Sequence, residues 1–209
     1  MSVRLAPVLG FLIVAILISS NAHAGPGVDL LVQQRSTGAT AFFTGTDESG
    51  CIFTGVFVIA NSDSERLLPS QGTPTARVAV VISQFDLCLE IPILTGDGLS
   101  EDAAIVVSPN LREASVTAVV PVLNLANGTM VDVFVDLKFV ATSIMVAENQ
   151  HEQDFSLPGF IIGTTFNHTF RYATAGGSVM TADGELQTDS SLEAQIDHVR
   201  AGTVVVGRP

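Results

Sequence analysis

Apolar and polar residues alternate most regularly in residues 116–140, on either side of the dipeptide Asn127-Gly128. This pattern predicts a β-hairpin, because both central residues of a type I′ turn need a positive φ, which Asn and Gly adopt readily. With Ala126 opposite Thr129, the apolar pairs expected across the hairpin are Val122 with Val133, Val120 with Val135, Ala118 with Leu137 and Val116 with Phe139. The hairpin should therefore turn one face to a core and the other mainly to solvent.

Pro121 lies within the first of these two strands and has no backbone N–H to donate. In the expected register, the missing donor points away from the partner strand. We therefore expect Pro121 at a sheet edge or at a bulge.

Other alternating segments predict strands in much of the remaining chain. They are residues 40–44, 51–60, 77–94 with a β-bulge near Ser83-Gln84, 103–108 and 160–172. Predicted turns lie at residues 47–50, at 95–102 and at Gly176-Gly177.

The last stretch, residues 192–206, fits two structures. Ser190 and Glu193 resemble a capping box, and the apolar residues that follow have helical spacing. The same residues also alternate, and residues 200–202 could reverse the chain. No other segment predicts a long helix, so we favour a terminal hairpin.

Many strands without a long helix predict an all-β fold. We expect an antiparallel β-sandwich, of which a jelly roll is one form, with a closed β-barrel as the alternative. Residues 61–75 are rich in Ser, Pro and Gly and are expected to form a long loop that exposes Leu67 and Leu68. That loop is either a plain connector or a binding loop.

The N-terminus has the pattern of an export signal. Arg4 supplies a positive charge, residues 8–18 are apolar, and Ala22-His23-Ala24 is a small-x-small cleavage pattern. The apolar run is shorter than the roughly 20 residues that a membrane anchor needs, and no later segment is long and apolar enough to span a bilayer. We therefore expect residues 1–24 to be a signal peptide and residues 25–209 a single secreted or periplasmic domain that does not insert into a membrane.

Charge narrows the choice of partners. The chain has 21 acidic against 9 basic residues, a formal net charge of −12. Such a balance repels phosphate backbones and anionic lipid surfaces, so binding to nucleic acid is disfavoured. Charged residues are only 14% of the chain, while typical domains have about 25%, which indicates a well-packed protein.

Cys51 and Cys88 are the only two cysteines. Export would place them where oxidation persists, so they are expected to form a disulfide.

Catalytic motifs are missing from the sequence. It has no G-x-S-x-G, no H-E-x-x-H and no G-x-x-x-x-G-K-[ST]. His151 is predicted in a solvated loop and His168 on a half-buried strand. Asp132 and Asp136 share one strand face, but four residues of strand separate them by about 13 Å. Glycosidase carboxylates lie about 5–9.5 Å apart, so this pair is better explained as a solvated face.

Acidic residues gather in the predicted loops, in the segments 47–48, 97–102, 148–154 and 183–185. Calcium favours such oxygen-rich loops, but the D-x-D-x-D-G spacing is absent. No cofactor is predicted, and calcium is kept as the alternative. Trp is absent and a single Tyr is present, so few aromatic platforms are available for a glycan.

Residues 82–88, 131–137 and 158–162 resemble segments of a family of uncharacterised, exported bacterial all-β proteins. The resemblance spans much of the chain after residue 24 and implies an exported all-β domain. It implies no activity and no site residues.

Two functions fit these observations. The first is an exported, non-catalytic module with a binding, adhesion or structural role, whose ligand is a protein or a glycan. The second is an extracytoplasmic hydrolase whose site is built from loops. An apolar surface around Leu67 and Leu68 favours the first, and clustered His or carboxylate groups in a pocket favour the second.

Overall fold

The computed structural model describes residues 30–67, 70–71, 73–157, 160–186 and 191–207. The predicted signal peptide and Leu68 lie outside the described residues. Within them the chain forms twelve β-strands and no helix. The strands are β1 (Leu30–Thr46), β2 (Ile52–Leu67), β3 (Ser70–Gln71), β4 (Thr75–Asp86), β5 (Ile91–Ser100), β6 (Ala103–Val107), β7 (Glu113–Asn124), β8 (Thr129–Ala141), β9 (Val146–Leu157), β10 (Phe160–Thr181), β11 (Gly184–Glu185) and β12 (Glu193–Gly207).

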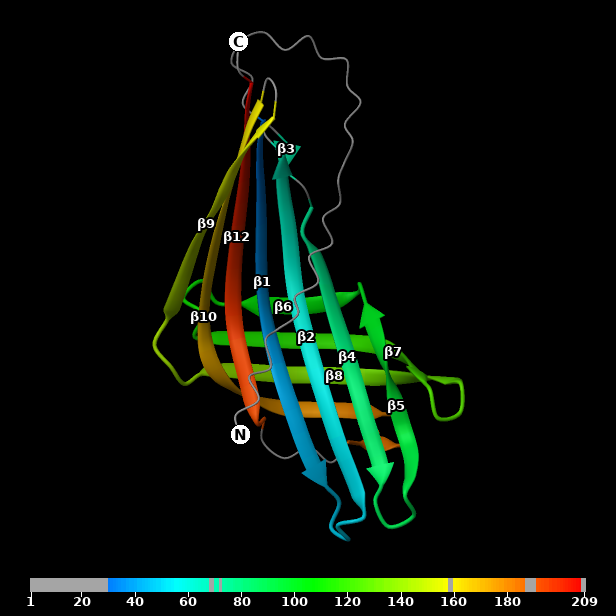
Figure 1. Cartoon of the computed structure of the whole chain (residues 1–209). Helices are drawn as coiled ribbons and strands as arrows, with labels where there is room; N and C mark the ends of the chain where they lie inside the picture. The colour runs from blue at the N-terminus through cyan, green and yellow to red at the C-terminus, as the bar shows by residue number, and fades with distance from the viewer. Residues whose placement is uncertain (1–29, 68–69, 72, 158–159, 187–190, 208–209) are drawn as a thin grey trace, which may run out of the picture.

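Figure 1 shows that the strands form two layers that cross each other. The main layer runs along the long axis and contains β1, β2, β4, β5, β9, β12 and the first part of β10. The second layer runs across it and contains β6, β7, β8 and the last part of β10. Every pairing is antiparallel. The predicted antiparallel β-sandwich is confirmed, with its layers in the crossed arrangement.

The order of the strands follows the chain. Hydrogen-bonded neighbours run from β1 through β12, β10, β8, β7, β5 and β4 to β2, and β2 also pairs with β1. Apart from the side strands β3, β6, β9 and β11, each strand therefore pairs with the next one in sequence. This order is a meander, and it lacks the Greek-key crossovers from which a jelly roll is built.

β10 passes from one layer to the other. Its residues 160–173 pair with β12, and its residues 173–180 pair with β8. Beyond this change of partner, Gly177 lies opposite Leu137 of β8, has a φ of 129°, and a Cβ there would collide with the carbonyl oxygen of Asp136. The predicted turn at Gly176-Gly177 is wrong, because β10 continues through both glycines in an unbroken ladder with β8.

The other corner is formed where β5 lies against β7. Gly98 and Val122 are the single residue pair between them. A Cβ at Gly96 or Gly98 would collide with the carbonyl oxygens of Leu123 and Pro121, respectively. Glycine is needed at both positions because the two backbones touch.

The hairpin of β7 and β8 has the predicted faces but not the predicted register. Val122 pairs with Val131 instead of Val133. The loop has four residues instead of two, because the carbonyl oxygen of Asn124 accepts a hydrogen bond from the amide of Gly128 at 2.7 Å. A shift of two residues leaves every side chain on its predicted face, because side chains alternate with a period of two.

On the side of β7 away from β8, β6 pairs with residues 114–118 and β5 with Val122, so Pro121 belongs to neither ladder in the described part of the chain. Its missing N–H is therefore needed by no ladder there. The carbonyl oxygen of Pro121 still lies against Gly98 of β5, so the expected sheet edge or bulge at Pro121 stays a prediction.

The predicted single strand of residues 77–94 is two strands. Asp86 reverses the chain after β4, because its Oδ1 accepts hydrogen bonds from the amides of Cys88 and Leu89 at 2.9 and 2.8 Å. The β4–β5 ladder shifts register between Gln84, which pairs with Leu94, and Phe85, which pairs with Pro92. The ladder of β4 with β2 has no such shift. The predicted bulge therefore does not restore one apolar face, and Phe85 remains 37% exposed on the other face.

Three predicted loops or turns belong to strands. Residues 61–67 continue β2, residues 95–100 belong to β5, and residues 200–202 lie inside β12. Residues 147–157, predicted as a polar segment, form most of β9. Polar residues continue these strands because neighbouring ladders supply backbone hydrogen bonds whatever the side chain is.

The predicted disulfide between Cys51 and Cys88 is confirmed, with the two Cα atoms 5.3 Å apart. It ties the residue before β2 to the turn between β4 and β5. The amide of Leu87 also donates to the carbonyl oxygen of Cys51 at 2.7 Å.

The core lies between the two layers. In the main layer, described side chains are fully buried only as far as Ala39 in β1, Ala60 in β2 and Ile196 in β12. Beyond these residues the main layer continues past the second layer as a single layer (Figure 1). We call residues 30–37, 61–67, 146–157, 160–169 and 197–207 the extension, and the two-layer remainder the packed half. The largest fully buried side chains, all in the packed half, are Phe139, Ile82, Leu137, Ile196, Val56, Val58, Val78, Val80, Val116, Val120, Val122 and Val133.

Candidate functional site

The extension has two faces, and their residues follow from strand alternation. The ladders of β1 with β12, β1 with β2 and β10 with β12 run without a register shift from the packed half into the extension. Alternate residues therefore keep the face that they have next to the core. We call the face that continues from the core side the inner face, and the opposite one the outer face.

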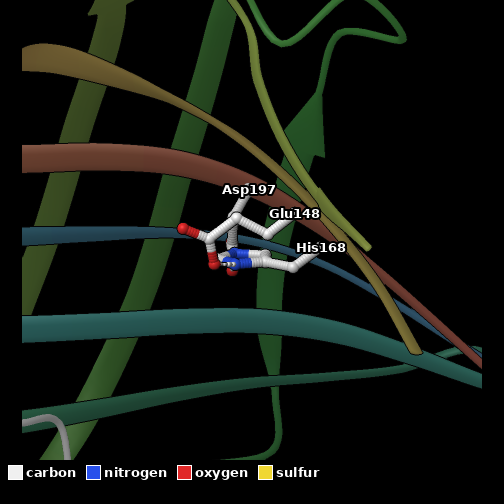
Figure 2. Close-up of polar contacts among 3 residues, drawn as sticks. All are labelled: Glu148, His168 and Asp197. Carbon is white, nitrogen blue, oxygen red and sulfur yellow. Dashed lines mark ion pairs between the residues drawn. The ribbon is translucent and has the colours of Figure 1, made fainter. Parts of the chain in front are cut away.

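A group of titratable side chains lies on the outer face where the extension begins. His168 of β10 has Glu148 of β9 as its cross-strand partner, and Asp197 of β12 lies on its other side. The Nδ1 atom of His168 is 3.9 Å from Oε2 of Glu148, and its Nε2 atom is 3.5 Å from Oδ2 of Asp197. Figure 2 shows both carboxylates converging on the imidazole ring. Three neighbouring strands are thus tied by one ring.

These contacts are longer than hydrogen bonds and are ion pairs only when the imidazole is protonated. Both distances exceed the 2.7–3.2 Å or so of ordinary N–H···O hydrogen bonds. The side chain of His168 is 21% exposed and that of Asp197 24%, whereas that of Glu148 is 59% exposed. The pair of His168 with Asp197 is therefore less screened by solvent than the pair with Glu148.

Asp197 lies over a glycine. A Cβ at Gly38 of β1 would come within 2.8 Å of Oδ1 of Asp197 and would collide with Oδ1 of Asn61. Burial raises the pKa of Asp197, and Asp63 raises it further, while His168 opposes both effects. The missing side chain at Gly38 makes room for two polar side chains above the sheet.

Aromatic rings flank His168 along the outer face of β10. The ring of His168 stacks on Phe170 at a centroid distance of 5.1 Å and lies 6.4 Å from Phe166. Phe170 contacts Tyr172 edge to face at 5.6 Å. The imidazole is held in a row of rings, which restricts its rotation.

The arrangement of His168 is unlike that of a catalytic histidine. A general base needs one ring nitrogen free to face a substrate or a nucleophile. Here each ring nitrogen faces a carboxylate, and no Ser or Cys forms a hydrogen bond or ion pair with the ring among the described residues. The group can balance charge across three strands, and its geometry does not prepare proton transfer to a ligand.

The other residues considered from the sequence are dispersed. Leu67 is the last residue of β2, and His151 lies in β9, with both side chains outside the described part. His198 lies on the inner face, away from His168. Asp132 and Asp136 are exposed on β8, as expected for a solvated face.

The acidic residues Asp47 and Asp86 stabilise their own turns by accepting hydrogen bonds within them. Asp47 accepts hydrogen bonds from the hydroxyl of Ser49 at 2.6 Å and from the amide of Ile52 at 2.8 Å, and these bonds lower its pKa. Asp86 closes the turn before β5 in the same way. Within the described residues, no group of three or more His, Cys, Asp or Glu side chains could hold a metal ion.

Part of the candidate group could have been found from the sequence. Pairing of Leu157 with Phe160 places Glu148 within one residue of the position opposite His168, and a register shift in the β9–β10 ladder supplies the difference. The pairing of β10 with β12 that adds Asp197 has no local signal.

No protein-family model matches this chain, and no curated protein or solved structure shows significant similarity to it. Within the described residues, no helix has the length and apolar character needed to cross a membrane.

Proposed function

We propose that this chain is an exported, non-catalytic β-sandwich module that binds its ligand on the extension. The closed geometry of His168 carries the proposal: both ring nitrogens face carboxylates, so the clustered titratable groups of the outer face are engaged with one another. The packed half contains the buried core, and the described side chains that the extension adds on the strands beyond it are mostly polar and accessible. An accessible polar surface of this kind supports a role in binding.

Export is supported by two observations. Residues 1–24 have the pattern of a signal peptide, and the disulfide between Cys51 and Cys88 fits an oxidising compartment. Expression of the full chain in a secreting bacterial host should release a protein that begins at Gly25, as read by N-terminal sequencing. Recovery of the chain only in the cytoplasm with residues 1–24 attached would contradict export.

The non-catalytic role is tested by screening the purified mature protein against ester, glycoside and peptide substrates. We expect no turnover above the substrate alone. Ala replacements at His168, His151 and His198 separate a real activity from a contaminant. Turnover that is abolished by His168→Ala, with the fold intact by circular dichroism, and kept in the other two variants would show that the hydrolase alternative is correct.

A further inference from the structure

The inner face of the extension brings two arginines together. Arg35 of β1 is directly opposite Arg200 of β12, in a ladder without register shifts. Side chains that are directly opposite in an antiparallel pair have Cβ atoms about 4.5–5.5 Å apart. Both arginines are exposed. Two guanidinium groups therefore project side by side from one face.

His198 lies next to this pair on the same face. Its Nε2 accepts a hydrogen bond from Nε of Arg200 at 2.9 Å. Burial lowers the pKa of His198, and the charges of Arg200 and Arg35 lower it further. Both arginines are thus close enough to act on the ring.

Among the described residues, no carboxylate compensates these charges on the inner face. Neither arginine forms an ion pair in the described part of the chain, and the guanidinium of Arg35 has no hydrogen bond there. The acidic side chains described in the extension occupy the outer face: Asp63, Glu65, Glu148 and Asp197. The inner face instead carries neutral polar groups near the arginines: Thr37, Ser62, Ser64, Asn167 and Thr169.

This distribution is unexpected for the composition. Acidic residues outnumber basic ones 21 to 9 in the chain, yet two arginines face each other with no acid beside them among the described residues. Like charges directly opposite across a ladder destabilise a sheet. A bound anion would remove that repulsion, and guanidinium groups bind phosphate, sulfate and carboxylate groups through paired hydrogen bonds.

We propose that Arg35, Arg200 and His198 form a binding site for a compact oxyanion, a phosphate, sulfate or carboxylate group carried by the ligand. The proposal deepens the proposed function and rests on it, since it names the chemistry that the extension recognises. The hydroxyl and amide groups around the arginines supply further donors. A long polyanion fits less well, because the net charge of −12 repels its remaining length.

Binding should strengthen as the pH falls through the range in which His198 gains a proton. Two charged groups face His198: Arg200 on its own strand and Arg35 on the neighbouring strand β1. Its direct cross-strand partners are uncharged, Thr37 on β1 and Thr169 on β10. The bound anion favours the protonated imidazole, so its pKa should rise on binding.

The test is a titration of the mature protein with inorganic phosphate, sulfate or acetate at constant ionic strength, followed by NMR and calorimetry. We expect one saturable site for phosphate or sulfate, with shifts centred on Arg35, Arg200 and His198. Arg35→Gln and Arg200→Gln should each weaken binding at least tenfold. Arg77→Gln is the matched control, because Arg77 lies on the outer face and pairs with Glu101 at 3.6 Å, and it should bind phosphate as the wild type does.

Each variant has a second readout in thermal unfolding. Without phosphate, Arg35→Gln should raise the melting temperature slightly, because the like-charge pair is gone. With phosphate, the wild type should gain stability and the variant should not. Acetate tests whether one negative charge is enough, and a sulfated polysaccharide tests the preference for a compact ligand.

Three results would overturn this site. They are non-saturable shifts, equal weakening in Arg77→Gln, and tight binding of the polysaccharide without binding of phosphate. Catalytic turnover in the substrate screen would overturn the proposed function and leave this titration intact, whereas failure of the titration alone would leave a non-catalytic module with another ligand.

Discussion

The packed half and the extension share the strands β1, β2, β10 and β12 and differ in what the alternate positions of these strands carry. In β1, the inner positions Ala39, Ala41 and Phe43 are buried in the core, and one step further the inner positions become Thr37 and Arg35. The ladder to β12 continues across this change without a shift. Backbone pairing therefore extends a strand past its core.

The two regions should also differ in stability. Burial of apolar area contributes about 25 cal/mol per Å², while a backbone hydrogen bond contributes about 0.5–1.5 kcal/mol net. The packed half has both contributions, and the described extension relies mainly on the second. Changes in the packed half should therefore lower the free energy of global unfolding, and changes in the extension should act locally.

Loss of the disulfide should have the largest effect. Cys51→Ser with Cys88→Ser removes a link over a sequence separation of 37 residues, which the chain-entropy model equates with about 3–4 kcal/mol of stability. Urea unfolding of the double variant and of the reduced wild type should show this loss equally. Titration of two free thiols in unreduced, denatured wild type would contradict the bridge.

Gly98→Ala should rank next, because its Cβ would collide with the carbonyl oxygen of Pro121 at the corner between layers. We expect a loss of about 3 kcal/mol in the free energy of unfolding. Gly176→Ala is the matched control, since a Cβ there meets nothing within 4 Å. Equal losses in the two variants would show that the β5–β7 corner is not tightly packed.

A matched pair of valines compares the two regions directly. Val120 in β7 is fully buried, and Val199 in the extension is half-buried. Val120→Ala should cost about 2 kcal/mol, or about 4–8 °C in melting temperature, and Val199→Ala less than about 1 kcal/mol. Similar costs would mean that the extension is as well packed as the core.

The smallest effect concerns pH. Burial raises the pKa of Asp197 in the folded state, so the stability contributed by its neutral form is present below about pH 3.9 and is lost as the pH rises through the raised value. Asp197→Asn should therefore be more stable than the wild type at pH 7, by up to about 1 kcal/mol, and should lose less stability between pH 4 and pH 7. Glu65→Gln controls for loss of one charge from the same face, and melting curves across pH 4–8 measure both. A destabilised Asn variant at pH 7 would show that the ion pair with His168 outweighs burial.

The sequence predicted which face of a strand is buried better than it predicted which residue lies opposite on the partner strand. It placed Val116, Val120 and Val122 on the buried side of β7, and the structure agrees. It assigned the wrong register to the hairpin, because alternation is equally satisfied by a shift of two residues. The turn was decided by Asn124, whose Oδ1 accepts from the amides of Ala126 and Thr95 at 3.0 and 3.3 Å.

The candidate site was less accessible to sequence reasoning. His168 and Glu148 were each noted as single polar residues, Arg200 was noted only within a possible chain reversal at residues 200–202, and Arg35 was not noted at all. Arg35 and Arg200 are far apart in the chain, and neither lies in a motif. Their meeting depends on the pairing of β1 with β12, which joins a strand near the start of the described chain to its last strand.

By itself, the sequence determined that this chain folds as antiparallel strands with a buried and a solvated face, and that Cys51 and Cys88 form a bridge. The two faces follow from the alternation of side chains along each strand, and the bridge follows because the chain has only two cysteines. Tertiary structure alone decided which strands pair, that β10 changes partner from β12 to β8 at Ala173, and that the described acidic side chains of the extension lie on the face opposite Arg35 and Arg200. The physical reason is that backbone hydrogen bonds are the same for every residue, so the choice of partner strand depends on how the whole set of apolar faces closes one core.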